Sequence, residues 1–262
     1  MNTTRRKEWF DDDELWRALT PLMFSKERCG DAAVLVPKAL KLVKPAGEDV
    51  LDLCCGFGRW SIPLARRGFR VTGVDRTARF LNRARADAKR GRARIEWVRQ
   101  DMRDFIRPSG FDLALSMFTS FGYFDDKGED LLVLRNLFTS LRPRGSLLME
   151  MAGKEILARV FQPTTSSPLP DGGVLFERHE VLDGWSRMRN EWTLIKNGKA
   201  RTWRFHVTIY SGQELRDRLE LAGFTDVKLF GSFSGDEYGL NAQRLIAVGR
   251  RPKCTPGADT RK

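Results

Sequence analysis

Val50-Leu-Asp-Leu-Cys-Cys-Gly-Phe-Gly58 is the part of the chain from which the rest of the fold can be read. Val50 to Cys54 is short, apolar and bounded by residues that break secondary structure, so it predicts a buried central strand. Gly56 and Gly58 predict a tight turn into a helix, because glycine accepts a positive φ and lets the backbone come close to a ligand. The stretch therefore indicates a strand, a ligand-binding turn and a helix, in that order.

Strands and helices alternate on the carboxyl side of this turn, which is typical of a parallel sheet with right-handed crossovers. Each predicted strand is short and apolar, and each predicted helix ends at a glycine or proline signal. The expected strands are 50–54, 69–74, 95–98, 111–117 and 146–151, and the expected helices are 58–67, 77–90 and 127–141.

The pattern changes after residue 151, where three strand-like segments follow one another without a helix. They are 174–182, 186–195 and 200–210, and Asn197-Gly198 is a two-residue hairpin turn. Pro163 to Pro170 is expected to be a loop that leads into this antiparallel insertion. Ser211 and Glu214 form a capping-box pattern that opens a helix to Ala222, and two last strands are expected at 227–230 and 245–248.

Five regions are expected from these boundaries. They are an N-terminal helical lid (1–47), a cofactor-binding core (48–151), an antiparallel insertion that shapes a substrate pocket (152–210), the C-terminal part of the core sheet (211–250) and a disordered basic tail (251–262). The lid is inferred from aromatic and aliphatic residues at helical spacing, among them Trp9, Phe10 and Trp16.

Composition excludes several classes of protein. The chain has 262 residues with a hydrophobic fraction of 41%, and no run approaches the ~20 apolar residues of a membrane helix. Acids follow the basic N-terminus in place of an apolar stretch, so a secretory signal is not expected and cytoplasmic localisation is. Four cysteines without a C-x-x-C pair and two separate histidines argue against a zinc site, and no metal is expected.

The net charge of +12 leaves two interpretations open. Ten arginines between Arg76 and Arg107 would suit a nucleic-acid surface. Arg76, Arg79, Arg83 and Arg90 also lie near one side of a predicted helix, which is typical of a solvated face. The solvated face is favoured, because aromatic residues do not alternate with these arginines as they do in proteins that bind single strands.

Three acids at the ends of successive strands define the expected ligand. Asp75 lies 17 residues after Gly58 and suits the two hydroxyls of a ribose. Asp101 and Met102 could supply the hydrogen-bonding edge and the apolar slot for an adenine. Asp52, at the start of the glycine turn, would repel a pyrophosphate, and the third glycine of a dinucleotide motif is absent. A cationic sulfonium ligand, S-adenosylmethionine, is therefore expected, with S-adenosylhomocysteine as its product.

The same motifs resemble those of the seven-stranded Rossmann-like S-adenosylmethionine-dependent methyltransferases. The resemblance covers residues 48–151: the glycine motif, Val74-Asp75, Gln100-Asp101-Met102 and the turn from Leu141 to Gly145. It departs at Cys54 and Phe57, where the family usually has glycine and a small residue. It implies an α/β, doubly wound, mostly parallel seven-stranded sheet with an antiparallel insertion after the fifth strand. The further cofactor-binding residues expected are Arg76, Met117 and Phe118.

Within the family, Asp101-Met-Arg-Asp-Phe105 and Met117 to Tyr123 resemble small-molecule enzymes, including amino-sugar N-methyltransferases. The loop after the fourth strand should lie beside the transferable methyl, because ligands bind outside the carboxyl ends of parallel strands. His206 and Tyr123 are the candidate catalytic residues. The expected substrate-pocket residues are Thr119, Ser120, Phe121, Tyr210 and Tyr238.

Three functions remain open at this point. The first is methyl transfer from S-adenosylmethionine to nitrogen or oxygen of a small molecule by in-line displacement, by a monomer or homodimer. The second is an RNA or protein methyltransferase that uses the basic surface. The third is a protein that binds the cofactor without catalysis. The Asn/Asp-Pro-Pro-Tyr/Phe sequence that resembles a signature of base and amide methylation is absent after the fourth strand, which favours the first.

Overall fold

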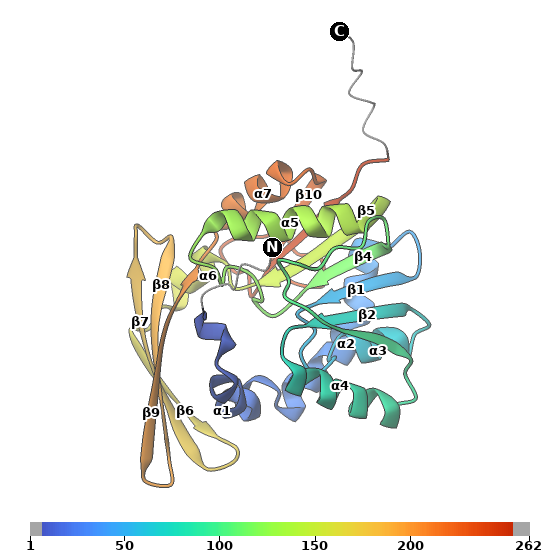
Figure 1. Cartoon of the computed structure of the whole chain (residues 1–262). Coiled ribbons are helices and arrows are strands. Elements are labelled where there is room, and N and C mark those ends of the chain that lie inside the picture. The colour runs from blue at the N-terminus through green and yellow to red at the C-terminus, as the bar shows by residue number, and fades with distance from the viewer. Residues whose placement is uncertain (1–6, 254–262) are drawn as a thin grey trace.

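The computed structural model describes residues 7–253, apart from the side chains of residues 26–29. Its main sheet has seven strands in the order β10-β11-β5-β4-β1-β2-β3 (Figure 1). The strands β1 to β5 are parallel, whereas β11 is antiparallel to β5 and to β10. Their bounds are β1 Asp49–Leu53, β2 Arg70–Asp75, β3 Ile95–Arg99, β4 Phe111–Ser116, β5 Leu141–Met151, β10 Thr225–Phe230 and β11 Leu245–Arg250.

The strand order reverses between β1 and β4. From β1 the chain builds outward to β2 and β3, and then it returns to the other side of β1 for β4 and β5. The crossovers on the two sides of this point leave a crevice at the carboxyl ends of β1 and β4, where ligands bind in open α/β sheets. The predicted fold class is confirmed.

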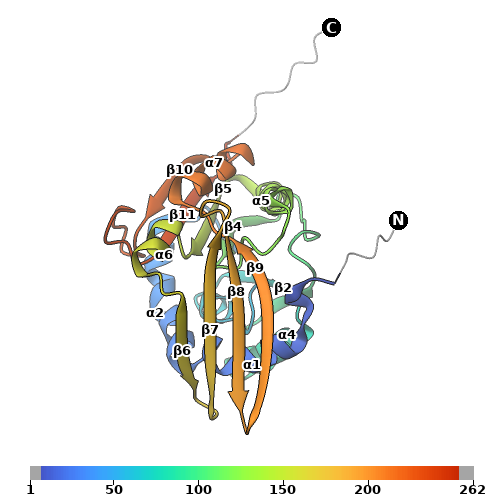
Figure 2. The same cartoon turned by 90° about the vertical axis from the view of Figure 1, so that its left-hand side faces the viewer.

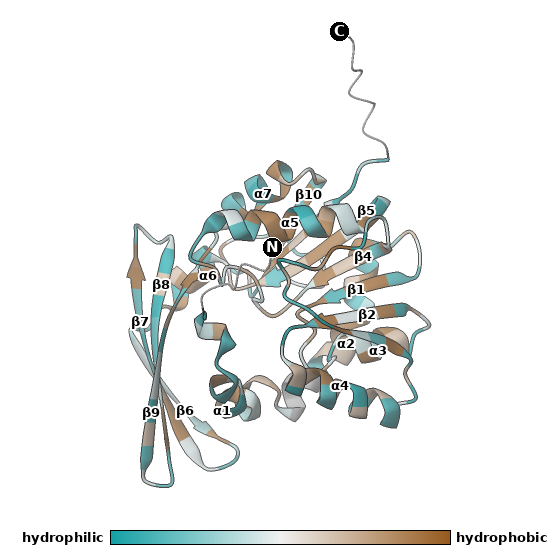
Figure 3. Ribbon diagram, viewed as in Figure 1, coloured by the Kyte–Doolittle hydropathy of each residue, from teal (hydrophilic) through white to brown (hydrophobic). Residues whose placement is uncertain are grey.

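Helices cover both faces of the sheet, because its central strands are apolar on both sides. α2 (Lys26–Val43) and α3 (Ser61–Ala65) pack with one face in a cluster that includes Val36, Leu64 and Leu113. α5 (Lys127–Ser140) and α7 (Gly212–Leu221) pack with the other face. α4 (Ala78–Arg90) lies beside β2 and β3. In Figure 3 the strands β4 and β5 are coloured mainly as hydrophobic.

The insertion is a separate four-stranded antiparallel sheet in the order β6-β7-β8-β9. Its strands are β6 Thr164–Leu169, β7 Gly173–Leu182, β8 Arg187–Lys196 and β9 Lys199–Thr208, and α6 (Lys154–Val160) precedes them. Figures 1 and 2 show this sheet standing beside the core. The 3₁₀ helix η1 (Trp9–Asp11) and α1 (Asp13–Met23) lie between the two, and Leu15 and Leu19 of α1 pack against Trp203 of β9.

Three expectations about elements are corrected. The segment 163–170 is not a loop, because Thr164–Leu169 is β6, the edge strand of the second sheet. The helix expected at 58–67 is only Ser61–Ala65, since a glycine turn occupies its beginning. Arg251 is not part of a loose tail, because its guanidinium donates to the carbonyls of Thr139 and Leu141. The rest of the predicted tail, from residue 254, lies outside the described residues.

The strand expected at 146–151 begins earlier, because β5 starts at Leu141 and includes the expected turn. The other predicted boundaries agree with the structure to within about two residues. The capping box at Ser211 and Glu214 is confirmed, with the Glu214 amide donating to Ser211 Oγ and the Ser211 amide to the Glu214 carboxylate. Between residues 7 and 253 no helix is both long and apolar enough to cross a membrane.

Candidate cofactor site

A cavity opens at the carboxyl ends of β1, β2, β3 and β4, beside the point where the strand order reverses. The empty space between its walls, its open mouth included, is about 990 Å³. Most of the walls are apolar or aromatic, and the charged residues among them are Asp52, Asp75, Asp101, Arg59 and Arg76.

The turn after β1 forms the floor of this cavity. Gly56 and Gly58 have φ values of +56° and +74°, which agrees with the prediction that glycine is needed there. Cys54 also has a positive φ, +59°, although it carries a side chain. Its Sγ lies 3.6 Å from Met102 Sδ, so the cysteine occupies space at the position where the family usually has glycine.

Asp75 is held at the tip of β2 by the glycine turn. Its Oδ2 accepts from the Gly56 amide at 2.9 Å, and its Oδ1 accepts from the Thr77 amide at 2.8 Å. The Thr77 side chain also hydrogen-bonds to this carboxylate. Since each carboxylate oxygen can accept about two hydrogen bonds, one position remains for a ligand hydroxyl. Burial raises the pKa of Asp75, while the hydrogen bonds from the Thr77 and Gly56 amides and from the Thr77 side chain oppose the rise.

Asp52 lies deeper, at the end of β1, with only 2% of its surface exposed. Its Oδ2 accepts a hydrogen bond of 2.5 Å from Ser61 Oγ at the start of α3. Burial raises the pKa of Asp52 to about 7, against the effect of Ser61 and with a contribution from the nearby Asp75. A cation placed in the cavity would favour the ionised form of this carboxyl group.

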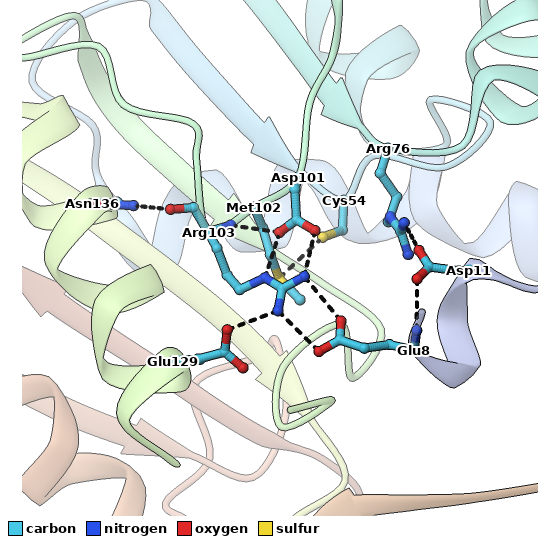
Figure 4. A network of polar contacts seen from close by, with 9 residues as sticks. All are labelled: Glu8, Asp11, Cys54, Arg76, Asp101, Met102, Arg103, Glu129 and Asn136. Carbon is cyan, nitrogen blue, oxygen red and sulfur yellow. Dashed lines mark hydrogen bonds and ion pairs between the residues drawn. The ribbon is translucent and has the colours of Figure 1, made fainter. Parts of the chain in front are cut away.

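Asp101 follows β3 and belongs to a network around Arg103 (Figure 4). Arg103 donates to Asp101, Glu8 and Glu129, which come from three separate parts of the chain. Burial raises the pKa of Asp101, but the hydrogen bonds from Arg103 outweigh it and hold this pKa below its usual value. Asp101 and its neighbour Met102 both line the cavity.

The N-terminal segment covers the mouth. The cavity is lined by Phe10 of η1, by Trp16 and Met23 of α1, and by Phe24, which follows α1. The Phe24 ring lies over Gly56, so close that a Cβ there would be 2.9 Å from the ring. Arg59, in the turn before α3, donates to the carbonyl of Met23 and lies over the ring of Phe24. These contacts fix the end of α1 to the glycine turn.

The loop after β4 forms the remaining wall. Met117, Phe118, Ser120 and Tyr123 line the cavity. Phe118 lies under the Arg59 guanidinium, 3.9 Å from the ring centre. Burial raises the pKa of Tyr123, which keeps its hydroxyl neutral.

Most of the expected cofactor residues therefore come together in one cavity. The cavity-lining ones are Asp52, Cys54, Gly56, Asp75, Arg76, Asp101, Met102, Met117 and Phe118. The cavity is also lined by Ser120 of the expected pocket, by Phe10 and Trp16 of the expected lid, and by the candidate catalytic residue Tyr123. Gly58 does not line it. A Cβ on Gly58 would meet the Trp97 ring at 2.6 Å, so this glycine makes room for β3.

Several expected pocket residues lie elsewhere. Phe121 is buried against Tyr210, whose hydroxyl donates to Asp130 at 2.6 Å inside the core. Thr119 Oγ1 accepts from the Ala152 amide, and the Tyr238 hydroxyl donates to Glu155 at the start of α6. None of these four predicted pocket residues lines the cavity.

His206 is also away from the cavity. It is exposed on β9, where side chains alternate between the two faces, and its neighbour Phe205 packs on Trp9. His206 therefore points away from the core, and its position does not support the predicted role as a base. Trp9 itself lies behind the wall, between Tyr123 and Phe205.

Sequence reasoning missed Arg59, Phe24 and Arg103. Arg59 directly follows the glycine motif, and an arginine at the edge of a ligand-binding turn is a signal that could have been used. Phe24 belonged to the predicted aromatic stripe, but nothing in that stripe indicated contact with Gly56. The charge partners of Arg103 lie as far as 95 residues away in the sequence, so no local pattern reveals them.

Comparison with known proteins agrees with this geometry. Residues 50–145 match the family model described as a methyltransferase domain. YqeM of Bacillus subtilis, provisionally named a methyltransferase, is 27% identical over 80% of this chain and 86% of its own length. The cypemycin N-terminal methyltransferase of a Streptomyces species is 26% identical over 77% of this chain and 82% of its own length.

Solved structures share the fold over almost the whole chain. An S-adenosylmethionine-dependent methyltransferase from Clostridium acetobutylicum superposes with a TM-score of 0.74, 14% identity and coverage of 92% and 98% of the two chains. S-adenosylmethionine-bound CalS10, an amino pentose methyltransferase from Micromonospora echinaspora, superposes with a TM-score of 0.64 and 18% identity. The match covers 96% of this chain and 100% of CalS10. The chain has the Rossmann-like fold of S-adenosylmethionine-dependent methyltransferases. Residues 50–145 are the part of this fold that matches the methyltransferase-domain family model.

Proposed function

We propose that this protein binds S-adenosylmethionine in the cavity and transfers its methyl group to an amine of a small molecule. The observation that carries the proposal is the arrangement of Asp52, Asp75 and Asp101. These three carboxyl groups lie at the carboxyl ends of β1, β2 and β3 and line one cavity whose other walls are mainly apolar. That distribution suits a ligand with a cation, a ribose and an adenine.

The role of each carboxyl group in binding the cofactor follows from the hydrogen-bond acceptor positions that its protein contacts leave free. Asp75 would accept a ribose hydroxyl through the position that its contacts with Gly56 and Thr77 leave free. Asp101 would accept from the adenine amine, beside the apolar Met102. Asp52 and the glycine turn would hold the methionine end, where Cys54 narrows the space. When bound, the sulfonium supplies an activated methyl carbon, and the aromatic walls exclude water from it.

The preference for an amine acceptor rests on the residues in the wall. Among the cavity-lining residues of the described chain there is no histidine and no lysine. The Tyr123 hydroxyl and the Cys54 thiol stay neutral, because burial raises the pKa of each. A hydroxyl acceptor benefits from a general base, whereas an amine that arrives neutral needs only to be positioned.

The names of two similar proteins support the same class of acceptor. The cypemycin enzyme is named as an N-terminal methyltransferase, and CalS10 is described as an amino pentose methyltransferase. An amine on a sugar or at a peptide terminus is therefore the acceptor class to test first. The lining of the cavity does not favour RNA, since Arg59 and Arg76 are its only arginines among the described residues, whereas the α4 residues Arg79, Arg83, Arg85 and Arg90 are exposed.

Label transfer from S-adenosylmethionine carrying a radioactive methyl group tests the proposal. The acceptor panel contains amino sugars, short peptides with free N-termini, the same compounds with the amine acetylated, phenols and bulk tRNA. Label is expected in free amines and not in their acetylated forms. At cofactor concentrations below saturation, Asp75→Asn should lower transfer by about tenfold or more, and the exposed His206→Ala should leave it unchanged.

Three other outcomes would contradict the proposal. Label found only in tRNA would replace it with an RNA methyltransferase. Label in phenols that is lost with His206→Ala would replace the amine by an oxygen acceptor and restore His206 as the base. Cofactor binding without label in any acceptor of the panel would favour a binding protein.

A further inference from the structure

Arg103 is a buried cation at the centre of a network that joins three parts of the chain. Only 3% of its side chain is exposed. Nε and Nη2 donate to Asp101 at 3.0 and 2.9 Å, Nη1 and Nη2 donate to Glu8 at 3.1 and 3.0 Å, and Nη1 donates to Glu129 at 2.8 Å. All five N–H groups of the guanidinium are therefore used. The ring of Phe124 lies 4.4 Å from its centre, so the guanidinium plane is fixed.

The hydrogen bonds from Arg103 determine which carboxylate oxygen of Asp101 can still accept a hydrogen bond from a ligand. Oδ1 of Asp101 accepts from the backbone amide of Arg103 at 2.9 Å and from its Nε at 3.0 Å, while Oδ2 accepts only from Nη2. Since a carboxylate oxygen accepts about two hydrogen bonds, Oδ1 is full and Oδ2 keeps one position. Asp101 lines the cavity, so a ligand can reach it there through this single acceptor.

Glu8 brings the N-terminal segment, residues 8–12, into the same network. It meets Arg103 through both carboxylate oxygens, a two-point contact that fixes orientation as well as distance. Asp11 of the segment pairs with Arg76, which lines the cavity, and Trp9 Nε1 donates to the carbonyl of Tyr123 in the loop after β4. Figure 4 shows Glu8 and Asp11 approaching the two arginines from the same side.

The charges of this network are unbalanced. Three carboxylates surround one guanidinium, and removal of the segment would take away one of them together with two hydrogen bonds. The position of the buried guanidinium then depends on whether Glu8 is docked, and the position of Asp101 depends on the guanidinium. The N-terminal segment and the open acceptor of Asp101 are coupled through one residue, and such coupling acts equally in both directions.

We propose that Arg103 is a positioning residue for adenine recognition. It holds Asp101 so that the one open acceptor meets the adenine amine, and it transmits the docking of Glu8 to that contact. Adenine binding in turn favours the docked segment, which closes the cavity. The inference rests on the proposed function, because it requires the cofactor or its product in this cavity.

Calorimetry with two ligands tests the inference. The first is S-adenosylhomocysteine, and the second is its hypoxanthine analogue, in which a carbonyl oxygen replaces the adenine amine. Wild type is expected to bind the first about tenfold or more tightly than the second, because the analogue leaves a charged acceptor unpaired. Arg103→Lys keeps the charge but lacks the planar fork, so the preference should fall to about threefold or less.

Glu8→Gln provides the second variant, in case Arg103→Lys does not fold. It should weaken binding of S-adenosylhomocysteine by about fivefold and reduce the preference for adenine, since the neutral amide makes a weaker bond to arginine. Glu14→Gln is the matched control. Glu14 lies near Glu8 in the sequence, but it pairs with Arg201 and does not touch Arg103, so binding should stay at the wild-type level.

Hydrogen exchange gives a readout that a purely structural role would not change. Amides 8–24 should gain protection when S-adenosylhomocysteine binds wild type, and this gain should shrink in Glu8→Gln. If wild type binds neither ligand, the proposed function fails. If wild type binds S-adenosylhomocysteine but does not prefer adenine, or if Glu8→Gln keeps both the affinity and the gain in protection, the positioning role of Arg103 is overturned and the proposed function stands.

Discussion

Asp52 is the residue of the cavity whose protonation state should depend most on whether a cationic ligand is bound. It is buried, it accepts from Ser61, and its pKa is raised to about 7 by burial. Asp75 and Asp101 share the cavity with it, and Arg59 lowers its pKa in part. At neutral pH this carboxyl group is therefore divided between its two protonation states, and a cationic ligand would shift it toward the ionised one.

We expect the affinity for S-adenosylmethionine to rise with pH and to level off above about pH 7. Below its pKa Asp52 is protonated, and a cation must then displace the proton, so affinity falls as the pH drops. If only the ionised form binds, the loss between pH 7.5 and pH 5.5 is about twentyfold. Calorimetry at a series of pH values measures this loss of affinity. Asp52→Asn should bind weakly with a flat profile, and an unchanged slope in that variant would assign the effect to another group.

Cys54 combines a side chain with a backbone conformation that favours glycine, with φ at +59°. Cys54→Gly should change the free energy of unfolding by less than about 1 kcal/mol, because relief of strain offsets the greater freedom of glycine in the unfolded chain. Cys54→Val should cost about 2 kcal/mol or more, since a branched side chain fits this conformation poorly. Chemical denaturation measures both, and equal stability of the two variants would show that the backbone there is not strained.

Residues near the glycine motif could be predicted from the sequence, and residues in long-range contacts could not. Asp52, Asp75 and Asp101 each end a strand, so the parallel sheet brings them together whatever the rest of the chain does. Arg103 and Phe24 depend on how the N-terminal segment folds back onto the core. The predicted base, His206, was assigned to a strand correctly, but the face of that strand could not be decided without knowing which side packs on Trp9.

The loop after β4 is the element that connects the two sheets. The Thr208 amide at the end of β9 donates to the Gly122 carbonyl at 2.7 Å, and Trp9 Nε1 donates to the Tyr123 carbonyl at 3.2 Å. Gly122 has a φ of +89°, and a Cβ there would lie 2.4 Å from the Thr208 carbonyl oxygen. The wall of the cavity that carries Ser120 and Tyr123 is therefore held in place by the insertion.

Gly122→Ala should destabilise the protein by more than about 2 kcal/mol, because it adds a backbone clash to an unfavourable conformation. In the fraction of this variant that folds, the rate of methyl transfer should fall more than the affinity for the cofactor, since Asp75 and Asp101 are not displaced. Gly172→Ala is the control, with a similar φ of +77° and nothing within 4 Å of the added Cβ. Thermal denaturation compares the two, and an equal loss in both would mean that the contact with β9 is unimportant.

Elements with strong periodicity were predicted well, and polar elements were missed. The sequence of β6, Thr-Thr-Ser-Ser-Pro-Leu from 164 to 169, lacks apolar alternation and contains a proline, so it was interpreted as a loop. Its position explains this composition, because β6 is an edge strand, where proline is tolerated and little side-chain surface is buried. The short helix α6 was missed as well, and none of its residues is buried.

At the scale of the whole molecule, the cavity is formed by three parts of the chain that are distant in the sequence. The core sheet supplies the carboxyl groups, η1 and α1 supply an aromatic cover, and the second sheet supports that cover through Trp203 and Phe205. This arrangement explains why the cofactor half of the site was predictable and the acceptor half was not. The acceptor half depends on how the insertion and the N-terminal segment pack together.

The central claim is that this cavity binds S-adenosylmethionine through Asp75, and calorimetry with S-adenosylhomocysteine tests it most directly. Wild type should bind one molecule per chain. Asp75→Asn should bind about tenfold or more weakly, since it loses a charged acceptor for the ribose. Asp112→Asn should bind as wild type, because Asp112 contacts Asp49 and Arg142 at the opposite end of the sheet. No binding by wild type, or undiminished binding by folded Asp75→Asn, would contradict the claim.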